Sequence, residues 1–230
     1  MARLHCGRRR FGGAILHSLD AAHGVPIYYI HNNGRGGLPE MAKRTDTKII
    51  VTTGAESTGK TDLCQHLASV FGAPWVPELA RGYVEQLGRP YSYDDVIAIA
   101  RLQLAEFEKT ANAGHPLVFF DTDLIITKVW LDVVYDRCPE WIPEAIQSHP
   151  ATLHLLCLPD IPWVPDPVRE NGGPMREKLS NIYRNELETF GLPYAEIGGD
   201  GDIRRERGVE AVRRVVADKS GCSVFPNYHF

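Results

Sequence analysis

Residues 54–61 read Gly-Ala-Glu-Ser-Thr-Gly-Lys-Thr, the complete G-x-x-x-x-G-K-[ST] pattern of a phosphate-binding loop. The glycines let the main chain curl so that successive N–H groups point at one anion. The amine of Lys60 can then reach the β- and γ-phosphates of a nucleotide, and the hydroxyl of Thr61 can ligate Mg²⁺. We therefore predict that the nucleotide is bound by Gly54, Glu56, Ser57, Thr58, Gly59, Lys60 and Thr61.

The segments on either side of this loop have the patterns that a phosphate loop requires. Residues 47–53 are β-branched and apolar, as in a buried parallel strand. Apolar residues recur at helical spacing over 60–71, and Gly72 followed by Pro74 provides a stop signal. The alternative is a glycine-rich turn with an incidental lysine, but the order strand, loop, helix favours the phosphate loop.

The composition of the whole chain is that of a globular protein in a reducing compartment. The 230 residues are 43 % hydrophobic and 23 % charged, with no run of 18 apolar residues that would span a membrane. The five cysteines are scattered and include no C-x-x-C pair, which argues against a zinc site or a disulfide framework. We predict a cytoplasmic protein with no membrane partner.

The first 40 residues differ from the rest of the chain. They contain five arginines, four of the nine histidines and two acidic residues. We expect residues 1–44 to be a flexible or artefactual extension, with Met41 as the hypothetical true start; a transit peptide is the alternative. Without residues 1–40 the chain has 20 basic and 27 acidic residues, a net charge of −7. Such a domain is a poor binder of nucleic acid, so none is expected as a partner.

From residue 46 onward, strand and helix patterns alternate, which predicts an α/β fold with a mostly parallel sheet. Ser92 followed by Asp95 has the pattern of a helix N-terminus. The predicted strands are 47–53, 74–77, 117–121, 152–158 and 194–197, and the predicted helices are 60–71, 78–87, 93–114, 123–135, 140–148, 175–190 and 203–217.

Three acidic residues lie at or just after the ends of predicted strands, at the edge of the sheet where α/β proteins bind ligands. Asp121 ends an apolar strand, where a phosphate-loop enzyme holds Mg²⁺ directly or through water; its alternative role is a helix N-cap. Asp123 could share that work or simply complement the helix dipole. Glu78 follows the second strand and could orient an acceptor hydroxyl and take its proton. Arg81, one turn later, could pair with Glu78 or with substrate, or form a weak surface ion pair.

Residues 159–175 are rich in proline and glycine and predict a long loop. Arg169 lies in it and Arg176 just beyond it. Arginines on a closing loop neutralise the charge of a transferring phosphoryl group and exclude water, although an ordinary surface loop is the alternative. Of the aromatic residues that could stack on a base, Trp130 shares a helix face with apolar residues, which favours a core position.

Four segments together resemble the kinase domain of the NadR-like family, the nicotinamide riboside kinases of bacterial NAD salvage. They are Gly54–Thr61, Val76–Val84, Phe119–Thr127 and Asp160–Glu170, within residues 46–218. The resemblance implies a P-loop kinase domain over 45–219 with a five-stranded parallel sheet, an arginine-bearing lid and a C-terminal tail, 220–230. Regulatory members also carry a DNA-binding and an adenylyltransferase domain, which we do not expect to be encoded in forty upstream residues.

The resemblance also implies a reaction, in which MgATP phosphorylates the ribose 5′-hydroxyl of nicotinamide riboside to give nicotinamide mononucleotide. By motif position, the implied catalytic residues are Lys60, Glu78, Asp121, Arg169 and Arg176. Glu78, Arg81, Asp121 and Asp123 would bind the nucleoside, and Thr61 and Asp121 the Mg²⁺, while Gly198 and Gly199 would border the adenine. Two alternatives are a kinase for another nucleoside or nucleoside monophosphate, and a nucleotide-binding regulatory ATPase.

Overall fold

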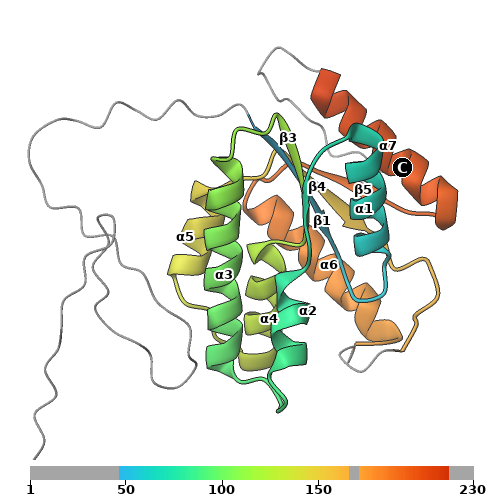
Figure 1. Ribbon diagram of the computed structural model, residues 1–230. Helices are drawn as coiled ribbons and strands as arrows, with labels where there is room; N and C mark the ends of the chain where they lie inside the picture. The colour runs from blue at the N-terminus through green and yellow to red at the C-terminus, as the bar shows by residue number, and fades with distance from the viewer. Residues whose placement is uncertain (1–46, 166–170, 218–230) are drawn as a thin grey trace, which may run out of the picture. The chain divides into compact units, whose positions relative to one another are not determined.

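The computed structural model describes residues 47–165 and 171–217, which all lie in the unit Thr45–Phe230. Five strands form one sheet in the order β2-β3-β1-β4-β5, and every neighbouring pair is parallel. Figure 1 shows the strands ending beside the loop that precedes α1. The strands are β1 (Lys48–Thr53), β2 (Trp75–Val76), β3 (Leu117–Asp121), β4 (Leu153–Cys157) and β5 (Tyr194–Ile197).

Seven helices connect and cover these strands within the described residues. Apart from α2, which packs on α3, they lie against the two faces of the sheet. They are α1 (Lys60–Phe71), α2 (Leu79–Gln86), α3 (Tyr93–Ala111), α4 (Leu124–Tyr135), α5 (Trp141–Ser148), α6 (Pro174–Thr189) and α7 (Gly201–Ala217).

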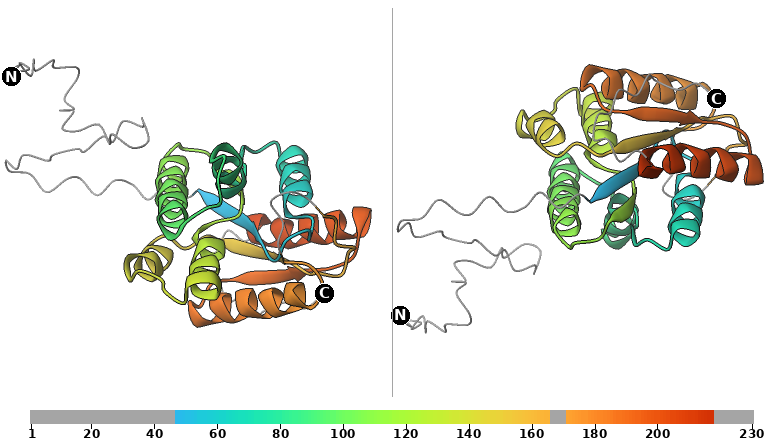
Figure 2. Two further views of the ribbon diagram at one scale, coloured as in Figure 1. Left: turned by 90° about the horizontal axis from the view of Figure 1, so that it is seen from below. Right: turned by 90° about the horizontal axis from the view of Figure 1, so that it is seen from above.

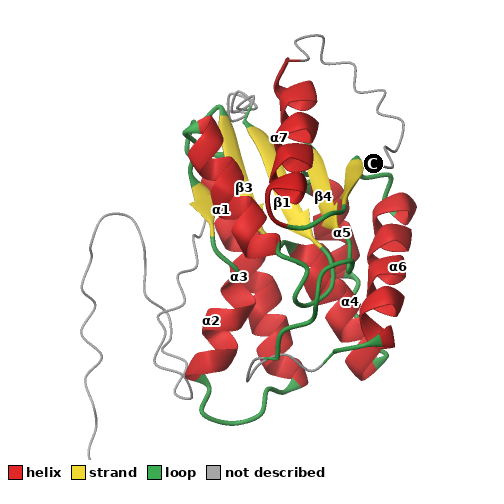
Figure 3. Ribbon diagram, turned by 90° about the vertical axis from the view of Figure 1, so that its right-hand side faces the viewer, coloured by secondary structure: helices red, strands yellow, loops and turns green. Residues whose placement is uncertain are grey.

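Alternating strand side chains divide the core between the two faces of the sheet. Ile50 of β1 and Phe119 of β3 pack with α1 and α7, which lie in front of the sheet in Figure 3. Val51 and Phe120 point the other way and pack with α3, and Leu156 of β4 packs with α4, α5 and α6. The end-on views of Figure 2 show the sheet between these two helical layers.

The predicted five-stranded parallel α/β fold is confirmed, and the element boundaries differ from the predictions by a few residues. The strand expected over 74–77 is limited to Trp75–Val76 because Pro74 and Pro77 cannot donate to a ladder, which is tolerable at an edge of the sheet. The helix expected from residue 123 begins at Leu124, because Asp123 is its N-cap.

The domain boundaries at residues 44–45 and 219–220 fall outside the described residues and stay predictions. Among the helices that the structure describes, none combines the length and the apolar character needed to cross a bilayer.

Candidate active site

The phosphate loop between β1 and α1 has a curled main chain. Ser57 and Gly59 have positive φ angles of 56° and 76°, whereas Thr58 between them does not, so left- and right-handed backbone conformations alternate before α1. This geometry produces a concave row of N–H groups that suits an anion. Gly54 has φ 131°, and a Cβ there would lie 2.6 Å from the carbonyl oxygen of Cys157. The start of the loop therefore accommodates no side chain, and the predicted role of Gly54 in shaping it has a steric basis.

Asp121 and Thr61 lie together at the end of this loop. The Thr61 hydroxyl donates to Oδ2 of Asp121 at 2.5 Å, and the Thr52 hydroxyl donates to Oδ1 at 3.4 Å. Asp121 is 2 % exposed, and burial raises its pKa above the ordinary value, while Thr61 and the charge of Lys60 oppose the rise. Hard oxygen donors of this kind suit Mg²⁺. The two residues predicted to hold the metal are thus adjacent.

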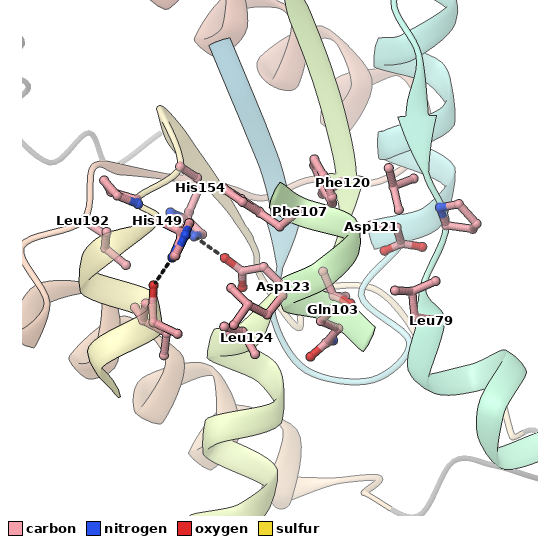
Figure 4. Close-up of a pocket in the computed structure, with 18 residues that line it drawn as sticks. Leu79, Gln103, Phe107, Phe120, Asp121, Asp123, Leu124, His149, His154 and Leu192 are labelled. Carbon is pink, nitrogen blue, oxygen red and sulfur yellow. Dashed lines mark hydrogen bonds and ion pairs between the residues drawn. The ribbon is translucent and has the colours of Figure 1, made fainter. Parts of the chain in front are cut away.

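Asp123 points away from Asp121 and toward His154, as Figure 4 shows. Its Oδ2 lies 2.9 Å from Nε2 of the buried His154, and its Oδ1 accepts from the amide of Ile125, which caps α4. The hollow beside this pair has a volume of about 20 Å³, room for roughly one water molecule. Asp123 therefore has a structural role as a helix cap, and its predicted contact with substrate stays a prediction.

Glu78 and Arg81 line the same cleft as the phosphate loop, a cavity of about 450 Å³. Burial raises the pKa of Glu78; Lys60 and Arg81 oppose this rise, and the carboxylates of Asp121 and Glu56 add to it. Arg81 forms an ion pair with Glu85 at 3.3 Å as well as acting on the charge of Glu78. The acidic residue proposed as a base is thus placed within electrostatic reach of the lysine that would bind phosphate.

The lining of this cleft also includes apolar and aromatic side chains. Tyr91 and Trp130 meet edge to face with ring centroids 4.7 Å apart, and Tyr183 lies in the same lining. The expectation that Trp130 belongs to the core is therefore incomplete, since it lines the cleft as well as packing on its helix. No sequence motif marks Tyr91 or Tyr183, which lie on the loop before α3 and on α6.

Two phosphate-loop side chains hold the described ends of the long loop between β4 and α6. Glu56 accepts from the amide and the side chain of Asn171, at 2.9 and 3.0 Å, and the Ser57 hydroxyl accepts from the amide of Val164 at 3.0 Å. The predicted lid thus contacts the phosphate loop at two positions, Val164 and Asn171. Arg169 lies outside the described residues, so its predicted role in catalysis stays a prediction.

Arg176 and Arg204 are buried arginines that contact the main chain of the phosphate loop. Arg176, in the first turn of α6, donates to the carbonyl oxygens of Glu56 at 3.2 Å and Ser57 at 2.9 Å. Arg204 of α7, which no sequence motif marks, donates to the carbonyl oxygen of Thr58 at 2.8 Å. The contacts of Arg176 place it where it shapes the loop, whereas its predicted contact with a transferring phosphoryl group stays untested.

Comparison with known proteins identifies the family. The NadR protein of Escherichia coli strain K12, named a trifunctional NAD biosynthesis/regulator protein, is 27 % identical over 190 residues. This match covers 79 % of the chain but 46 % of NadR, so the chain spans about half the length of the curated relatives it matches.

Two solved structures of NadR protein have the same fold. One, in complex with NR, superposes with a TM-score of 0.64, and the other, with NAD and AMP-PNP, with 0.62. Each is 23 % identical and covers 79 % of this chain, and the match spans 55 % and 53 % of those chains. The similarity to NadR noted in the sequence motifs is thus confirmed. A family model described as an AAA domain matches residues 49–205, more than half of the sequence, and the chain therefore belongs to this AAA-domain family, with the α/β fold of the P-loop kinases.

Proposed function

We propose that the protein is an ATP-dependent kinase that phosphorylates the ribose 5′-hydroxyl of nicotinamide riboside to give nicotinamide mononucleotide. The observation that carries the proposal is a single cleft lined by the phosphate loop, by Glu78 and by the aromatic residues Tyr91 and Trp130. These three kinds of group suit a triphosphate, a sugar hydroxyl and a flat heteroaromatic ring. A NadR structure in complex with NR supports the choice of acceptor.

The phosphate loop and Lys60 would bind the triphosphate of ATP. The concave amides and the positive end of α1 favour negative charge, and the Lys60 amine, which donates to the Ala55 carbonyl oxygen at 2.8 Å, adds a positive charge at the loop. Thr61 and Asp121 would hold Mg²⁺, which when bound neutralises charge on the phosphates. A NadR structure with AMP-PNP supports ATP as the donor.

Glu78 would orient the acceptor hydroxyl and take its proton. Its raised pKa makes it a better proton acceptor than an ordinary glutamate, since its charged form is disfavoured by burial and by neighbouring carboxylates. Arg81 and Asp123 are proposed contacts of the nucleoside, and Arg169 a contact of the transferring phosphoryl group. The loop that rests on Glu56 and Ser57 would exclude water from the reaction.

Mass spectrometry of products tests the proposal. The full chain is incubated with MgATP and a panel of nicotinamide riboside, thymidine, deoxyadenosine and thymidine monophosphate. We expect nicotinamide riboside to gain one phosphoryl group with the highest kcat/KM. Product formed from another nucleoside or a monophosphate alone would replace the acceptor, and ATP hydrolysis that no acceptor stimulates would indicate a regulatory ATPase instead.

A further inference from the structure

Four successive carbonyl groups of the phosphate loop each accept a hydrogen bond from a cationic side chain. Lys60 donates to Ala55 at 2.8 Å, Arg176 donates to Glu56 and Ser57, and Arg204 donates to Thr58. When the N–H groups of a curled loop face inward toward an anion, its carbonyl groups face outward. Outward carbonyls in a buried position need donors, since an unpaired buried acceptor is costly.

Arg176 connects the loop to the segment after β4. Arg176 is 6 % exposed. Besides the two loop carbonyls, it donates from Nη1 to the carbonyl oxygen of Ile161 at 3.0 Å. The rigid fork of a guanidinium can hold several acceptors in fixed directions, which the single amine of lysine cannot. Arg176 thus fixes the loop relative to the start of α6.

Arg204 performs the same task from α7. It is 3 % exposed and donates to the carbonyl oxygens of Thr58, Gly199 and Leu158 at 2.8, 2.7 and 3.1 Å, and to the carboxylate of Asp160. The other oxygen of Asp160 accepts from the amide of Gly199 at 2.6 Å. Arg204 therefore ties the phosphate loop to the segments that follow β4 and β5.

We propose that Arg176 and Arg204 are positioning residues that hold the phosphate loop in its anion-binding shape before nucleotide arrives. They act through the loop carbonyls, and their positive charges also raise the potential where phosphate binds. The inference rests on the proposed function in one respect, that the anion is the triphosphate of ATP. Its consequence is that losing either guanidinium weakens phosphate binding, with little effect on the acceptor.

The test measures anion affinity in variants that keep the fold. Calorimetric Kd values for MgATP and for inorganic tripolyphosphate are compared between the wild-type chain, Arg176→Lys and Arg204→Lys, with circular dichroism to check folding. We expect both ligands to bind about tenfold more weakly or worse to each variant, because lysine keeps the charge but loses the fork. The KM of the acceptor at saturating ATP should change less than about twofold, since Tyr91, Trp130 and Glu78 are unchanged in these variants.

Two further variants provide a matched control and an alternative test in case the lysine variants do not fold. Arg214→Ala removes an exposed arginine of the same helix, paired with Glu210, and should bind tripolyphosphate as the wild type does. If the lysine variants fail to fold, Asp160→Asn is measured instead. The side chain of Asp160 is half-exposed, and removing its charge weakens its ion pair with Arg204. We expect tripolyphosphate to bind about threefold more weakly to this variant.

Variants that bind tripolyphosphate as tightly as the wild type would overturn the inference and leave the proposed function intact. Equal weakening in Arg214→Ala would overturn it too. A wild-type chain that shows the arginine-dependent binding but phosphorylates no nucleoside would end the proposed function alone. A wild-type chain that binds neither anion would end both.

Discussion

Glu78 is placed at a helix start without being used as a cap. It is the N-cap residue of α2, with φ −60° and ψ 108°, yet its side chain makes no capping hydrogen bond. Acidic residues at such positions usually accept from the first turn of the helix. A carboxylate directed into the cleft instead, with its pKa raised, has the properties of a proton acceptor rather than of a structural cap.

Glu78→Gln is expected to lower kcat by roughly 10²- to 10⁴-fold while changing the Kd of MgATP little, because a proton acceptor acts on the chemical step. A base must be charged, so wild-type kcat should fall as pH falls through the pKa of Glu78, which lies above its ordinary value of 4.5. The variant should lack this acid limb. The measurement is kcat against pH, with Glu144→Gln, an exposed position on α5, as the matched control. Normal turnover in Glu78→Gln would transfer the role of base to Asp121.

The turn between α2 and α3 is stabilised by one buried carboxylate. Asp95 accepts from the guanidinium of Arg89 at 2.7 and 2.9 Å and from the amide of Ser92 at 2.7 Å, completing a capping box at the start of α3. The Arg89 hydrogen bonds hold the pKa of Asp95 well below its usual range, and those from Ser92 contribute. This turn carries Tyr91, so the same contacts hold an aromatic side chain that lines the cleft.

Asp95→Asn is expected to lower the free energy of unfolding at pH 7 by about 1–2 kcal/mol, since a cap and a charged partner are lost. The folded-state pKa of Asp95 is depressed, so its contribution is complete above the unfolded pKa of about 3.9 and is lost as pH falls from there toward the folded value. The difference between wild type and variant should therefore shrink below about pH 4. Urea unfolding at pH 7 and at low pH measures it. Asp94→Asn, its exposed neighbour in the same turn, should behave as wild type, and a difference independent of pH would refute the ionic contribution.

Helices and strands were predictable here because their signals are local. Ser92 and Asp95, three residues apart, form the capping box of α3. The glycines that let the phosphate loop curl lie within the loop itself. The residues that the sequence did not reveal depend on distant partners. Arg204 contacts Thr58, which lies 146 positions away in the sequence, and Trp130 lines a cleft together with residues of α2 and with Tyr91. A buried arginine or a half-buried tryptophan has the same local pattern whether it binds a ligand or fills the core.

On the scale of the whole domain, the site contains residues from the sheet and from the helical layers on both of its faces. The phosphate loop leaves β1, Asp121 ends β3, Glu78 starts α2, and the two arginines come from α6 and α7. In the sequence, Arg176 lies 119 positions from its partner Ser57, and Arg204 lies 146 positions from its partner Thr58. A ligand that fills this site therefore binds to several elements of the folded domain at once, and its binding energy should appear as global stability rather than as local ordering.

Mg²⁺ with AMP-PNP at a concentration 100-fold above its Kd is expected to stabilise the folded chain by about 2.7 kcal/mol. For a domain of this size, this corresponds to a rise in Tm of roughly 5–10 °C. Chelation of Mg²⁺ should remove much of the rise, since the phosphates then lose the contacts through Thr61 and Asp121. In Asp121→Asn the nucleotide-dependent rise should be smaller and nearly insensitive to chelation, because a neutral amide is a weaker magnesium ligand than a carboxylate. Differential scanning fluorimetry measures all four conditions, with adenosine, which lacks phosphates, as the control ligand. A rise of the same size with adenosine, or one that chelation leaves unchanged in the wild type, would contradict a magnesium–triphosphate site at this loop.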